Sequence, residues 1–393
     1  MKILIFNSLY TDFVKGGAER SVKFLAESLV NNNVSVTVVA LTNKRSFQAS
    51  ENGVFVQYLK NRNVYWAFDE SNKNRKINRL LKYIWHLIEA FNIFQYHRLR
   101  KLIKDEAPDV VHTNNITGFS PIIWFICKNL KIPVVHTIRD YYLICSNSNM
   151  LRHSVKCEKQ CSMCRIFTAT RRIGAKNIDV IAGISNKVIE VHESNGYITQ
   201  PNVLIYNQLH RLREKEVRSN KHAGLVFGYL GRLSVHKGIE VLLNAFSFVT
   251  DENVRLIIGG NGDKNYVDYL KRKYDGENIE YIGHVDKDLF FKKIDALVVP
   301  SIWDEPFGRI ILEAYQYNLP VIGSKNGAIP ELVKHEKSGI LYSNETELIK
   351  VLVSFKENYS NYDWNISEVL SAFQDRDIAQ DYISLFDSLT NIT

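Results

Sequence analysis

The sequence predicts an α/β protein made of two domains, each built on a doubly wound parallel sheet. Short apolar segments typical of buried strands alternate with segments of helical period, and this alternation occurs twice along the 393 residues. The length exceeds what one hydrophobic core usually supports. Between the two series, residues 206–222 lose apolar side chains and gain charge, which is typical of a linker. We therefore expect a first domain at 1–205, the linker at 206–222 and a second domain at 223–366.

The composition is that of a soluble globular protein, with 45% apolar and 23% charged residues. The longest uncharged stretch, residues 110–127, contains His, Thr, Asn, Ser and Pro, which argues against a membrane span. The N-terminus, MKILIFNSLY, is typical of a first strand and resembles neither a signal nor a transit peptide. We expect a cytoplasmic protein.

The net charge of +8 is distributed unevenly. Residues 1–222 hold 33 Lys and Arg against 17 Asp and Glu, a net of +16, and the remaining residues hold 17 against 25, a net of −8. A basic first half indicates an anionic partner. Because no RNA- or DNA-binding signature is present, the sequence favours an anionic membrane surface over nucleic acid. Basic but solvated helix faces are the alternative.

The first half begins with a strand at residues 2–6, a loop that ends in Gly16-Gly17, and a helix at 18–30. This order places free backbone N–H groups at the carboxyl edge of a sheet, although it lacks the G-x-G-x-x-G pattern. Strands at 34–40 and 54–59 continue the sheet.

Residues 75–104 carry one long helical pattern with an apolar stripe and basic flanks. The stripe consists of Ile77, Leu80, Leu81, Ile84, Leu87, Ile88, Phe91, Leu99 and Leu102. A basic amphipathic helix can lie on a bilayer surface, and the same stripe can equally pack on a sheet. Both interpretations remain open from the sequence.

Polar residues follow two further strands, 109–112 and 133–137, which flank a helix at 121–130. The first strand ends in His112-Thr-Asn-Asn and the second in His136-Thr-Ile-Arg-Asp140. Open α/β sheets build their sites at such strand ends. A strand at 178–184 and a helix at 186–193 complete the domain.

Four of the five cysteines lie in a short insertion at 145–164: Cys145, Cys157, Cys161 and Cys164. A cytosolic cluster with a C-x-x-C element favours a metal over disulfides, and thiolates suit zinc or an iron–sulfur cluster. We expect a structural metal site there, and unligated thiols in a loop are the alternative.

The second series opens with a strand at 225–230 that ends at Gly231. Arg232 and Lys237 follow around a glycine turn, before a helix at 238–249. Two cations at this spacing can clamp a diphosphate and stabilise the charge that grows on it when a sugar–phosphate bond breaks. Two unrelated surface charges are the alternative.

The second domain continues with strands at 255–258, 279–282, 296–299 and 320–323, and with a helix at 264–274. Pro306 and Gly308 are expected to open one more helix, with free N–H groups at 307–310 that attract anions. Glu305 precedes this helix start and Glu313 lies within it. Carboxylates on both sides of an anion-binding turn indicate a ligand with phosphate and hydroxyl groups, such as a nucleotide sugar.

Several motifs together resemble the family-four glycosyltransferases, and the likeness covers essentially the whole chain. In the second half they are GR-x-x-x-x-KG at 231–238, GGNGD at 259–263, YIGHV at 281–285, PSIWDEPFGRIILEA at 300–314 and LPVIGSKNGAIPELV at 319–333. Weaker matches in the first half are GGAER at 16–20, DVVH at 109–112, PVVHTIRD at 133–140 and IAGIS at 181–185. The resemblance implies two Rossmann-like domains facing across a cleft (the glycosyltransferase B fold), with final helices at 367–393 that cross back to the first domain.

The resemblance also implies roles for individual residues. Arg232 and Lys237 would hold the donor diphosphate, and Glu305 would contact the donor sugar at the reacting centre without acting as a nucleophile. The implied donor-binding residues lie on turns and at the helix start: Gly16, Gly17, Gly231, Val285, Phe307, Gly308, Arg309 and Glu313. Glu313 would bind the ribose hydroxyls, and the backbone of Val285 the base.

One residue departs from the family pattern. Many relatives have a His before the aspartate at position 140, and this chain has Arg139. We expect Arg139 to stabilise charge in its place. His112 and His136 are expected to be buried structural residues.

The sequence thus predicts a retaining, metal-independent glycosyltransferase that passes a sugar from a UDP- or GDP-sugar to a glycan or lipid-linked acceptor, in bacterial surface polysaccharide or lipopolysaccharide synthesis. No cofactor is expected for transfer. The expected location is the inner face of the cell membrane, as a peripheral protein. The alternatives are a nucleotide-sugar epimerase or phosphorylase on the same fold, and a non-catalytic nucleotide-sugar-binding component of a polysaccharide assembly complex.

Overall fold

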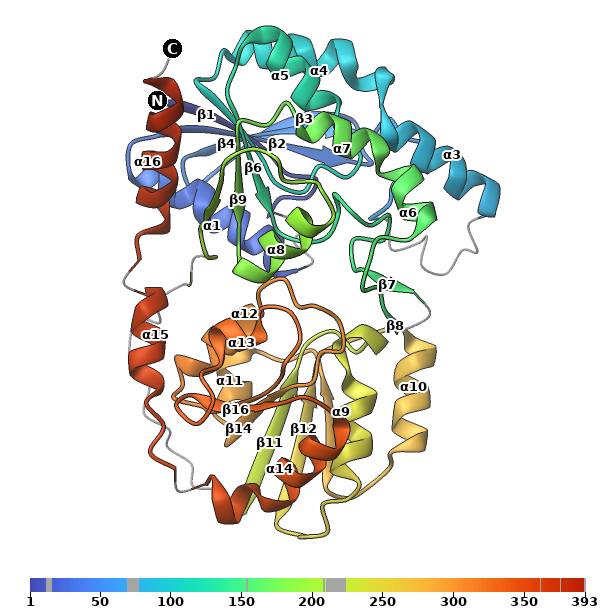
Figure 1. Cartoon of the computed structure of the whole chain (residues 1–393), viewed down its shortest axis with the longest axis vertical. Coiled ribbons are helices and arrows are strands. Elements are labelled where there is room, and N and C mark those ends of the chain that lie inside the picture. The colour runs from blue at the N-terminus through green and yellow to red at the C-terminus, as the bar shows by residue number, and fades with distance from the viewer. Residues whose placement is uncertain are drawn as a thin grey trace. The chain divides into compact units, whose positions relative to one another are not determined.

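The chain forms two compact units (Figure 1). The computed structural model describes residues 1–11, 16–68, 78–152, 155–207, 209, 224–360, 362–374 and 376–391. The first unit comprises Met1–Met150, Cys157–Gln208 and Asp377–Thr393, and the second comprises Leu151–Lys156 and Leu209–Arg376. Most of the expected linker at 206–222 lies outside the described residues.

The first unit is built on an eight-stranded sheet in the order β10-β9-β6-β5-β1-β2-β4-β3. All neighbouring strands are parallel except β3 and β4, which are antiparallel. The strands are β1 (Lys2–Phe6), β2 (Ser35–Thr42), β3 (Phe47–Glu51), β4 (Val54–Lys60), β5 (Val110–Thr113), β6 (Val134–Ile138), β9 (Val180–Gly183) and β10 (Asn202–Leu204). The strand order reverses between β1 and β5, so the loops after these two strands diverge and leave room for a site.

Helices cover both faces of this sheet. On one face α1 (Gly17–Asn31) packs beside α16 (Ile378–Thr390), the red helix next to the blue one in Figure 1, over Ile3, Ile5 and Val38. Alternate strand residues point the other way. There the Phe6 ring meets Phe119 at 5.4 Å, close to α4 (Ile93–Glu106) and α5 (Ile122–Leu130). The C-terminal helix is therefore part of the first unit's core.

The predicted single helix at 75–104 is in fact two helices, α3 (Arg79–Ala90) and α4. At Asn92 the backbone is not helical, and its N–H donates to the Ser120 hydroxyl at 3.0 Å rather than to a carbonyl of the preceding turn. The other elements here are α6 (Ser162–Phe167), α7 (Ala169–Ala175), α8 (Asn186–Ser194) and the hairpin β7 (Leu151–Arg152) and β8 (Val155–Lys156). No helix in the described part of the chain is long and apolar enough to cross a membrane.

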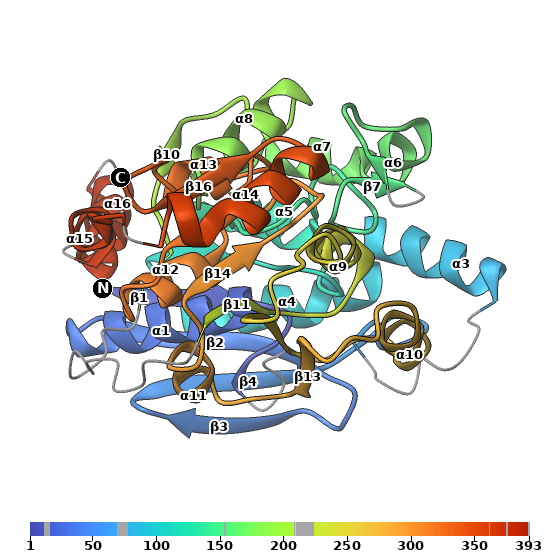
Figure 2. The same ribbon diagram turned by 90° about the horizontal axis from the view of Figure 1, so that it is seen from below.

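The second unit contains six parallel strands in the order β13-β12-β11-β14-β15-β16. They are β11 (Leu225–Leu230), β12 (Val254–Gly259), β13 (Ile279–Gly283), β14 (Ala296–Val299), β15 (Val321–Ser324) and β16 (Gly339–Tyr342). The helices are α9 (Ile239–Phe246), α10 (Lys264–Lys273), α11 (Lys287–Phe291), α12 (Arg309–Tyr315), α13 (Ile329–Leu332), α14 (Glu345–Asn358) and α15 (Ile366–Gln374). Helices α9 and α14 pack together over one apolar face of the sheet (Figure 2). The predicted α/β class with parallel sheets in both halves is confirmed.

The helix expected to open at Pro306 begins instead at Arg309. Gly308 precedes it with φ 91°, a left-handed conformation that an α-helix excludes. Pro306 therefore lies in the loop before α12, and the helix itself has only seven residues.

Candidate active site

In the second unit, the Lys237 ammonium lies against the Glu305 carboxylate. Its Nζ is 2.9 Å from Oε1 and 2.8 Å from Oε2. Lys237 ends a short 3-10 turn (Val235–Lys237) after β11, and Glu305 lies on the loop after β14. Strands β11 and β14 are parallel neighbours, so both loops leave the same edge of the sheet.

Two glycines allow these loops to come so close. Gly238 has φ 70°, and a Cβ there would lie 1.7 Å from the Pro300 carbonyl oxygen at the end of β14. Gly327 has φ 63°, and a Cβ there would lie 2.1 Å from the backbone nitrogen of Glu305. The loop after β15 also holds that backbone, because Ala328 N–H donates to the Glu305 carbonyl at 2.8 Å. Only glycine tolerates both approaches.

Two more groups donate hydrogen bonds to the Glu305 carboxylate. The Trp303 indole N–H donates to Oε2 at 2.9 Å and the Ser301 hydroxyl at 3.1 Å. Burial raises the pKa of this carboxyl, but the charge of Lys237 and the hydrogen bonds from Lys237, Trp303 and Ser301 together outweigh burial, so the pKa lies below its usual value. Glu305 is therefore an ionised carboxylate held in a buried place.

Arg232 lies on the exposed loop after β11, with its carbonyl accepting from the Tyr229 hydroxyl at 2.9 Å. Its charge reaches the neighbouring imidazole: burial, then Lys237 and then Arg232 lower the pKa of His236 to about 4. His236 in turn meets the Trp303 ring at 5.5 Å. The two predicted diphosphate-binding cations therefore flank one neutral imidazole.

Helix α12 carries a second ionic cluster. Arg309 Nε lies 3.2 Å from Glu313 Oε1, and Lys287, the first residue of α11, pairs with the other oxygen of Glu313. Sequence reasoning named Arg309 and Glu313, but it gave no role to Lys287. The lysine is 26 residues away in sequence, so only the three-dimensional structure reveals the contact.

The remaining predicted donor residues are backbone positions. Gly231 N–H donates to the Gly259 carbonyl at 3.1 Å, which joins the ends of β11 and β12. Val285 is half-buried and lies beside this turn. A Cβ on Gly259 would be 3.1 Å from Cγ1 of Val285. Phe307 is buried and Gly308 is the left-handed residue before α12.

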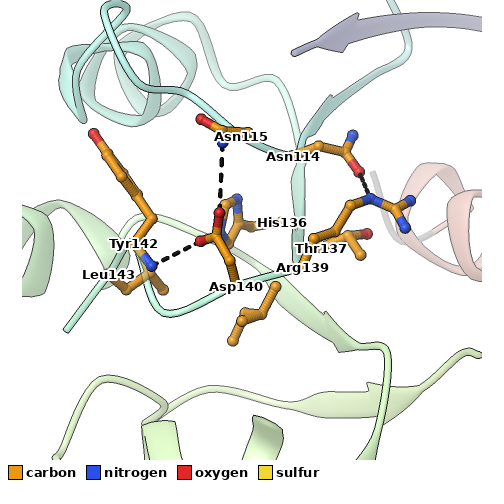
Figure 3. A pocket seen from close by; sticks show the side chains of 9 residues that line it. Asn114, Asn115, His136, Thr137, Arg139, Asp140, Tyr142 and Leu143 are labelled. Atoms are coloured by element: carbon orange, nitrogen blue, oxygen red, sulfur yellow. Dashed lines mark hydrogen bonds between the residues drawn. The ribbon is translucent and has the colours of Figure 1, made fainter. Parts of the chain in front are cut away.

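In the first unit, a small pocket lies at the carboxyl ends of β5 and β6 (Figure 3). Its lining includes Asn114, Asn115, Arg139, Asp140 and Tyr142. The enclosed space measures about 10 Å³, which is about the room that one water needs. This pocket lies next to the β1 and β5 position at which the strand order reverses, because the end of β5 contributes to both.

Arg139 is buried and held by two amides. Its Nε donates to Asn114 Oδ1 at 2.7 Å, and Nη1 donates to Asn207 Oδ1. Figure 3 shows the guanidinium directed toward Asn114 and away from the Asp140 carboxylate. The planar head is thus oriented by neutral partners at the strand ends.

Asp140 was not among the predicted site residues, and the structure gives it a distinct environment. Its Oδ1 accepts from Tyr142 N–H at 2.7 Å. Burial, with a smaller contribution from the charge of Glu19, raises the pKa of this carboxyl to about 6. Glu19 stands in the first turn of α1, so the Gly16-Gly17 start of that helix lies near the same pocket.

His112 and His136 are buried and engaged in side-chain hydrogen bonds. His112 Nε2 lies 2.8 Å from the Thr137 hydroxyl, which in turn lies 2.8 Å from the Tyr382 hydroxyl of α16. His136 Nδ1 lies 2.9 Å from the Thr113 hydroxyl. Burial places the pKa of both imidazoles far below the usual value, at about 3 for His136. Both are neutral residues that tie the strand ends together.

The described residues do not gather the four cysteines of the expected metal site into one metal-binding group, and the site stays a prediction. Cys145 and Cys164 face each other, and a hydrogen bond from the Cys164 thiol lowers the pKa of Cys145 to about 6. The hairpin before Cys157 groups with the second unit, where Lys156 pairs with Asp304 at 2.6 Å. Among the described residues, no three His, Cys, Asp or Glu side chains are grouped so that they could share a metal ion.

Comparison with known proteins identifies the family. The model of "Glycosyltransferase Family 4" matches residues 15–208, and that of "Glycosyl transferases group 1" matches residues 211–366. A 42.6 kDa protein from the cps region of Klebsiella pneumoniae is 34% identical over 340 residues, which span 84% of this chain and 87% of that protein. The chain is a group 1 glycosyltransferase. The predicted resemblance is confirmed.

Solved structures support the fold of this glycosyltransferase at low sequence identity. Sucrose-phosphate synthase from Thermosynechococcus elongatus superposes with a TM-score of 0.75 at 16% identity, covering 100% of both chains. HepE from Anabaena, in complex with UDP-glucose, gives 0.68 at 16% identity, covering 99% of this chain and 100% of that one. The predicted glycosyltransferase B fold is confirmed.

Three residues that contact Glu305 in this glycosyltransferase were not predicted from the sequence. Ser301 and Trp303 lie inside a quoted motif, and Gly327 inside another, yet none received a role. Their spacing of four and two residues from Glu305 was the available signal. For Gly327 the signal was a glycine after a strand, which predicts a positive φ but no partner.

Proposed function

We propose that this glycosyltransferase is a retaining, metal-independent enzyme that transfers a sugar from a UDP- or GDP-sugar to a glycan or lipid-linked acceptor. The observation that carries the proposal is the Lys237–Glu305 pair. An ammonium has three N–H donors, and two of them address Glu305. The third is available for a phosphate oxygen, so one side chain can join the donor diphosphate to the carboxylate beside the sugar.

The chemistry follows from the charges at this place. Lys237 and Arg232 would stabilise the negative charge that develops on the departing diphosphate. The ionised Glu305, whose pKa is depressed, would support positive charge at the anomeric carbon and orient the sugar. Glu313 would accept from the ribose hydroxyls in place of its present contacts with Arg309 and Lys287.

We further propose that the second unit binds the donor and the first receives the acceptor. The complexes of HepE with UDP and with UDP-glucose support a nucleotide-sugar donor. Gly16 and Gly17 keep their proposed donor-binding role, and Arg139 would supply charge where many relatives have a histidine. The turn residues Gly231, Val285, Phe307 and Gly308 would present backbone groups to the nucleotide.

The proposed pathway is the synthesis of a bacterial surface polysaccharide or lipopolysaccharide. It is supported by the relative from the cps region of Klebsiella pneumoniae and by the fold shared with WaaB, a lipopolysaccharide outer core galactosyltransferase. Lipid-linked acceptors lie at a membrane, so we propose that the protein works in the cytoplasm as a peripheral protein of the inner membrane face.

The test begins with melting temperatures in the presence of UDP-, GDP- and ADP-sugars. A bound donor raises the melting temperature of the wild type, and Glu313→Gln reduces the rise, whereas exposed Glu277→Gln leaves it unchanged. Transfer to oligosaccharide or lipid acceptors is then followed in EDTA, and the anomeric configuration of the product is read by NMR. An inverted product, or loss of turnover in EDTA, contradicts the proposed mechanism. Conversion of the donor without acceptor would instead indicate an epimerase.

A further inference from the structure

The first unit exposes an unusual number of large apolar side chains on α3 and at the start of α4. We call this set the α3–α4 surface; it consists of Leu80, Ile84, Leu87, Phe91, Ile93 and Phe94. Their exposed fractions run from 37% for Ile84 to 67% for Leu87. Soluble proteins seldom expose contiguous apolar residues of this size without a partner.

The spacing shows why these side chains share one side of α3. Leu80, Ile84 and Leu87 follow the i, i+4, i+7 pattern of one helix face. Trp85 and Glu89, on the opposite face, are buried in the unit. Helix α3 extends outward from its unit in both views (Figures 1 and 2), and these apolar side chains stay exposed among the described residues.

Helix α4 continues the surface with positive charge. Ile93, His97, Arg100 and Lys104 recur at helical spacing and are exposed, as is Lys101 beside them. The exposed part of α4 is therefore apolar at its first turn and mainly cationic beyond it, with one exposed carboxylate, Asp105, near its end. This arrangement is typical of helices that bind a bilayer interface. Their apolar side chains enter the interface, and the neighbouring cations contact the lipid phosphates.

The same helix contacts the pocket of Figure 3. Glu89, on the buried face of α3, accepts from the Tyr142 hydroxyl at 2.7 Å, and Tyr142 N–H donates to Asp140 at 2.7 Å. Two hydrogen bonds thus join the helix that carries the exposed apolar face to a carboxyl of the candidate acceptor pocket. An acceptor held in a bilayer under α3 would be presented near that pocket.

We propose that the α3–α4 surface docks this protein on an anionic membrane, with α3 lying in the plane of the interface. The proposal deepens the peripheral membrane location proposed above. A lipid surface fits better than a second copy of the chain, because the exposed cations Arg100, Lys101 and Lys104 would repel the same residues of a second copy. Anionic headgroups match that charge.

The test uses flotation with phosphatidylcholine vesicles, with and without phosphatidylglycerol, and no nucleotide sugar. The wild type floats with the anionic vesicles and detaches at high salt. Ile84→Ser with Leu87→Ser weakens binding by about tenfold or more. The matched control, Phe248→Ser with Val353→Ser, changes residues that are 55% and 53% exposed on the second unit, and leaves binding unchanged.

A second arm separates charge from apolar insertion. Arg100→Gln, Lys101→Gln and Lys104→Gln together remove the preference for anionic vesicles, whereas the same change at exposed Lys264, Arg272 and Lys350 of the second unit does not. Leu87→Trp adds a fluorophore whose emission shifts to the blue on vesicles if this face enters the interface. Neither arm measures turnover, so the proposed glycosyl transfer and the proposed membrane docking are tested independently.

Two outcomes overturn the proposal. One is vesicle binding by the Ile84 and Leu87 double variant that equals the wild type, with no blue shift of Leu87→Trp. The other is a dimer of the wild type in the absence of lipid, seen by light scattering, that does not form in the same double variant. That result would assign the α3–α4 surface to contact between two copies.

Discussion

Lys237 and Glu305 are 68 residues apart in sequence and form two hydrogen bonds of 2.9 and 2.8 Å. The carboxylate side chain is 13% exposed and the lysine 26%, so the pair is neither a surface ion pair nor a fully dry one. A partner removed from such a pair leaves a charge that water reaches poorly. The pair therefore links the stability of the second unit to its proposed chemistry.

Replacing Lys237 with Ala should destabilise the protein by about 2 kcal/mol at neutral pH, less than the ~3–5 kcal/mol of a fully buried pair, because the lysine is partly exposed. Urea unfolding measures this change. The pKa of Glu305 is lowered in the wild type, so its stabilisation is present above the unfolded pKa and is lost as pH falls through the folded one. Without Lys237 the loss should begin at a higher pH.

The matched control is the Lys237→Ala and Glu305→Gln double variant. Removing both charges should recover much of the stability, because neither member of the pair is left as an unpaired charge. Equal stability of Lys237→Ala and the wild type across the acid range would contradict the assignment.

Trp303→Phe should lower kcat by about tenfold with a smaller change in KM, because it removes the N–H that orients Glu305 and keeps an aromatic ring. The ring lies 5.1 Å from Lys237 Nζ, so Trp303→Ala should be more damaging through the lost cation–π contact. Steady-state kinetics distinguish the two variants. Trp364→Phe, on a half-buried indole of the same unit, is the control. Unchanged kcat in Trp303→Phe would remove this residue from the positioning of the carboxylate.

Glu89→Gln should change the pH dependence of stability. Burial raises the pKa of Glu89 from 4.5 to about 7, partly offset by Arg171. Because the pKa is higher in the folded state than in the unfolded state, ionisation of Glu89 destabilises the fold as the pH rises from 4.5 to about 7. The cost is on the order of 3 kcal/mol at about 1.4 kcal/mol per pKa unit.

Glutamine keeps an acceptor for Gly118 N–H and the Tyr142 hydroxyl without ionising. The free energy of unfolding of Glu89→Gln should therefore increase relative to that of the wild type between pH 5 and 7.5. Exposed Glu277→Gln should follow the wild type throughout. Parallel curves for Glu89→Gln and the wild type would show that the carboxyl is ionised over the whole range.

Arg139→Gln should lower kcat by at least about tenfold while leaving the donor-induced rise in melting temperature unchanged. The reason is that Arg139 belongs to the first unit, whereas the donor is proposed to bind the second. Arg139→Lys keeps the charge but not the planar head held by Asn114 and Asn207, and should retain more activity than the glutamine variant. A glutamine variant that retains full turnover would limit Arg139 to a structural role.

The order of the elements was readable from the sequence because strand and helix periods are local properties. Alternating apolar segments predicted two parallel sheets, and the GR-x-x-x-x-KG and PSIWDEPFGRIILEA motifs predicted the family. Where a prediction failed, a distant partner decided the outcome. The helix expected at 75–104 breaks at Asn92 because the Asn92 N–H bonds to the Ser120 hydroxyl, 28 residues away.

By itself, the sequence determined the fold class, the family and which loops carry polar groups. Only the tertiary structure decided how those groups pair. It joins Lys237 to Glu305 and Lys287 to Glu313, and it places half-buried Asp140 against the Tyr142 N–H. The physical reason is that backbone periodicity is local, whereas side-chain contacts depend on strand order. Two neighbouring parallel strands bring together the ends of loops that are far apart along the chain.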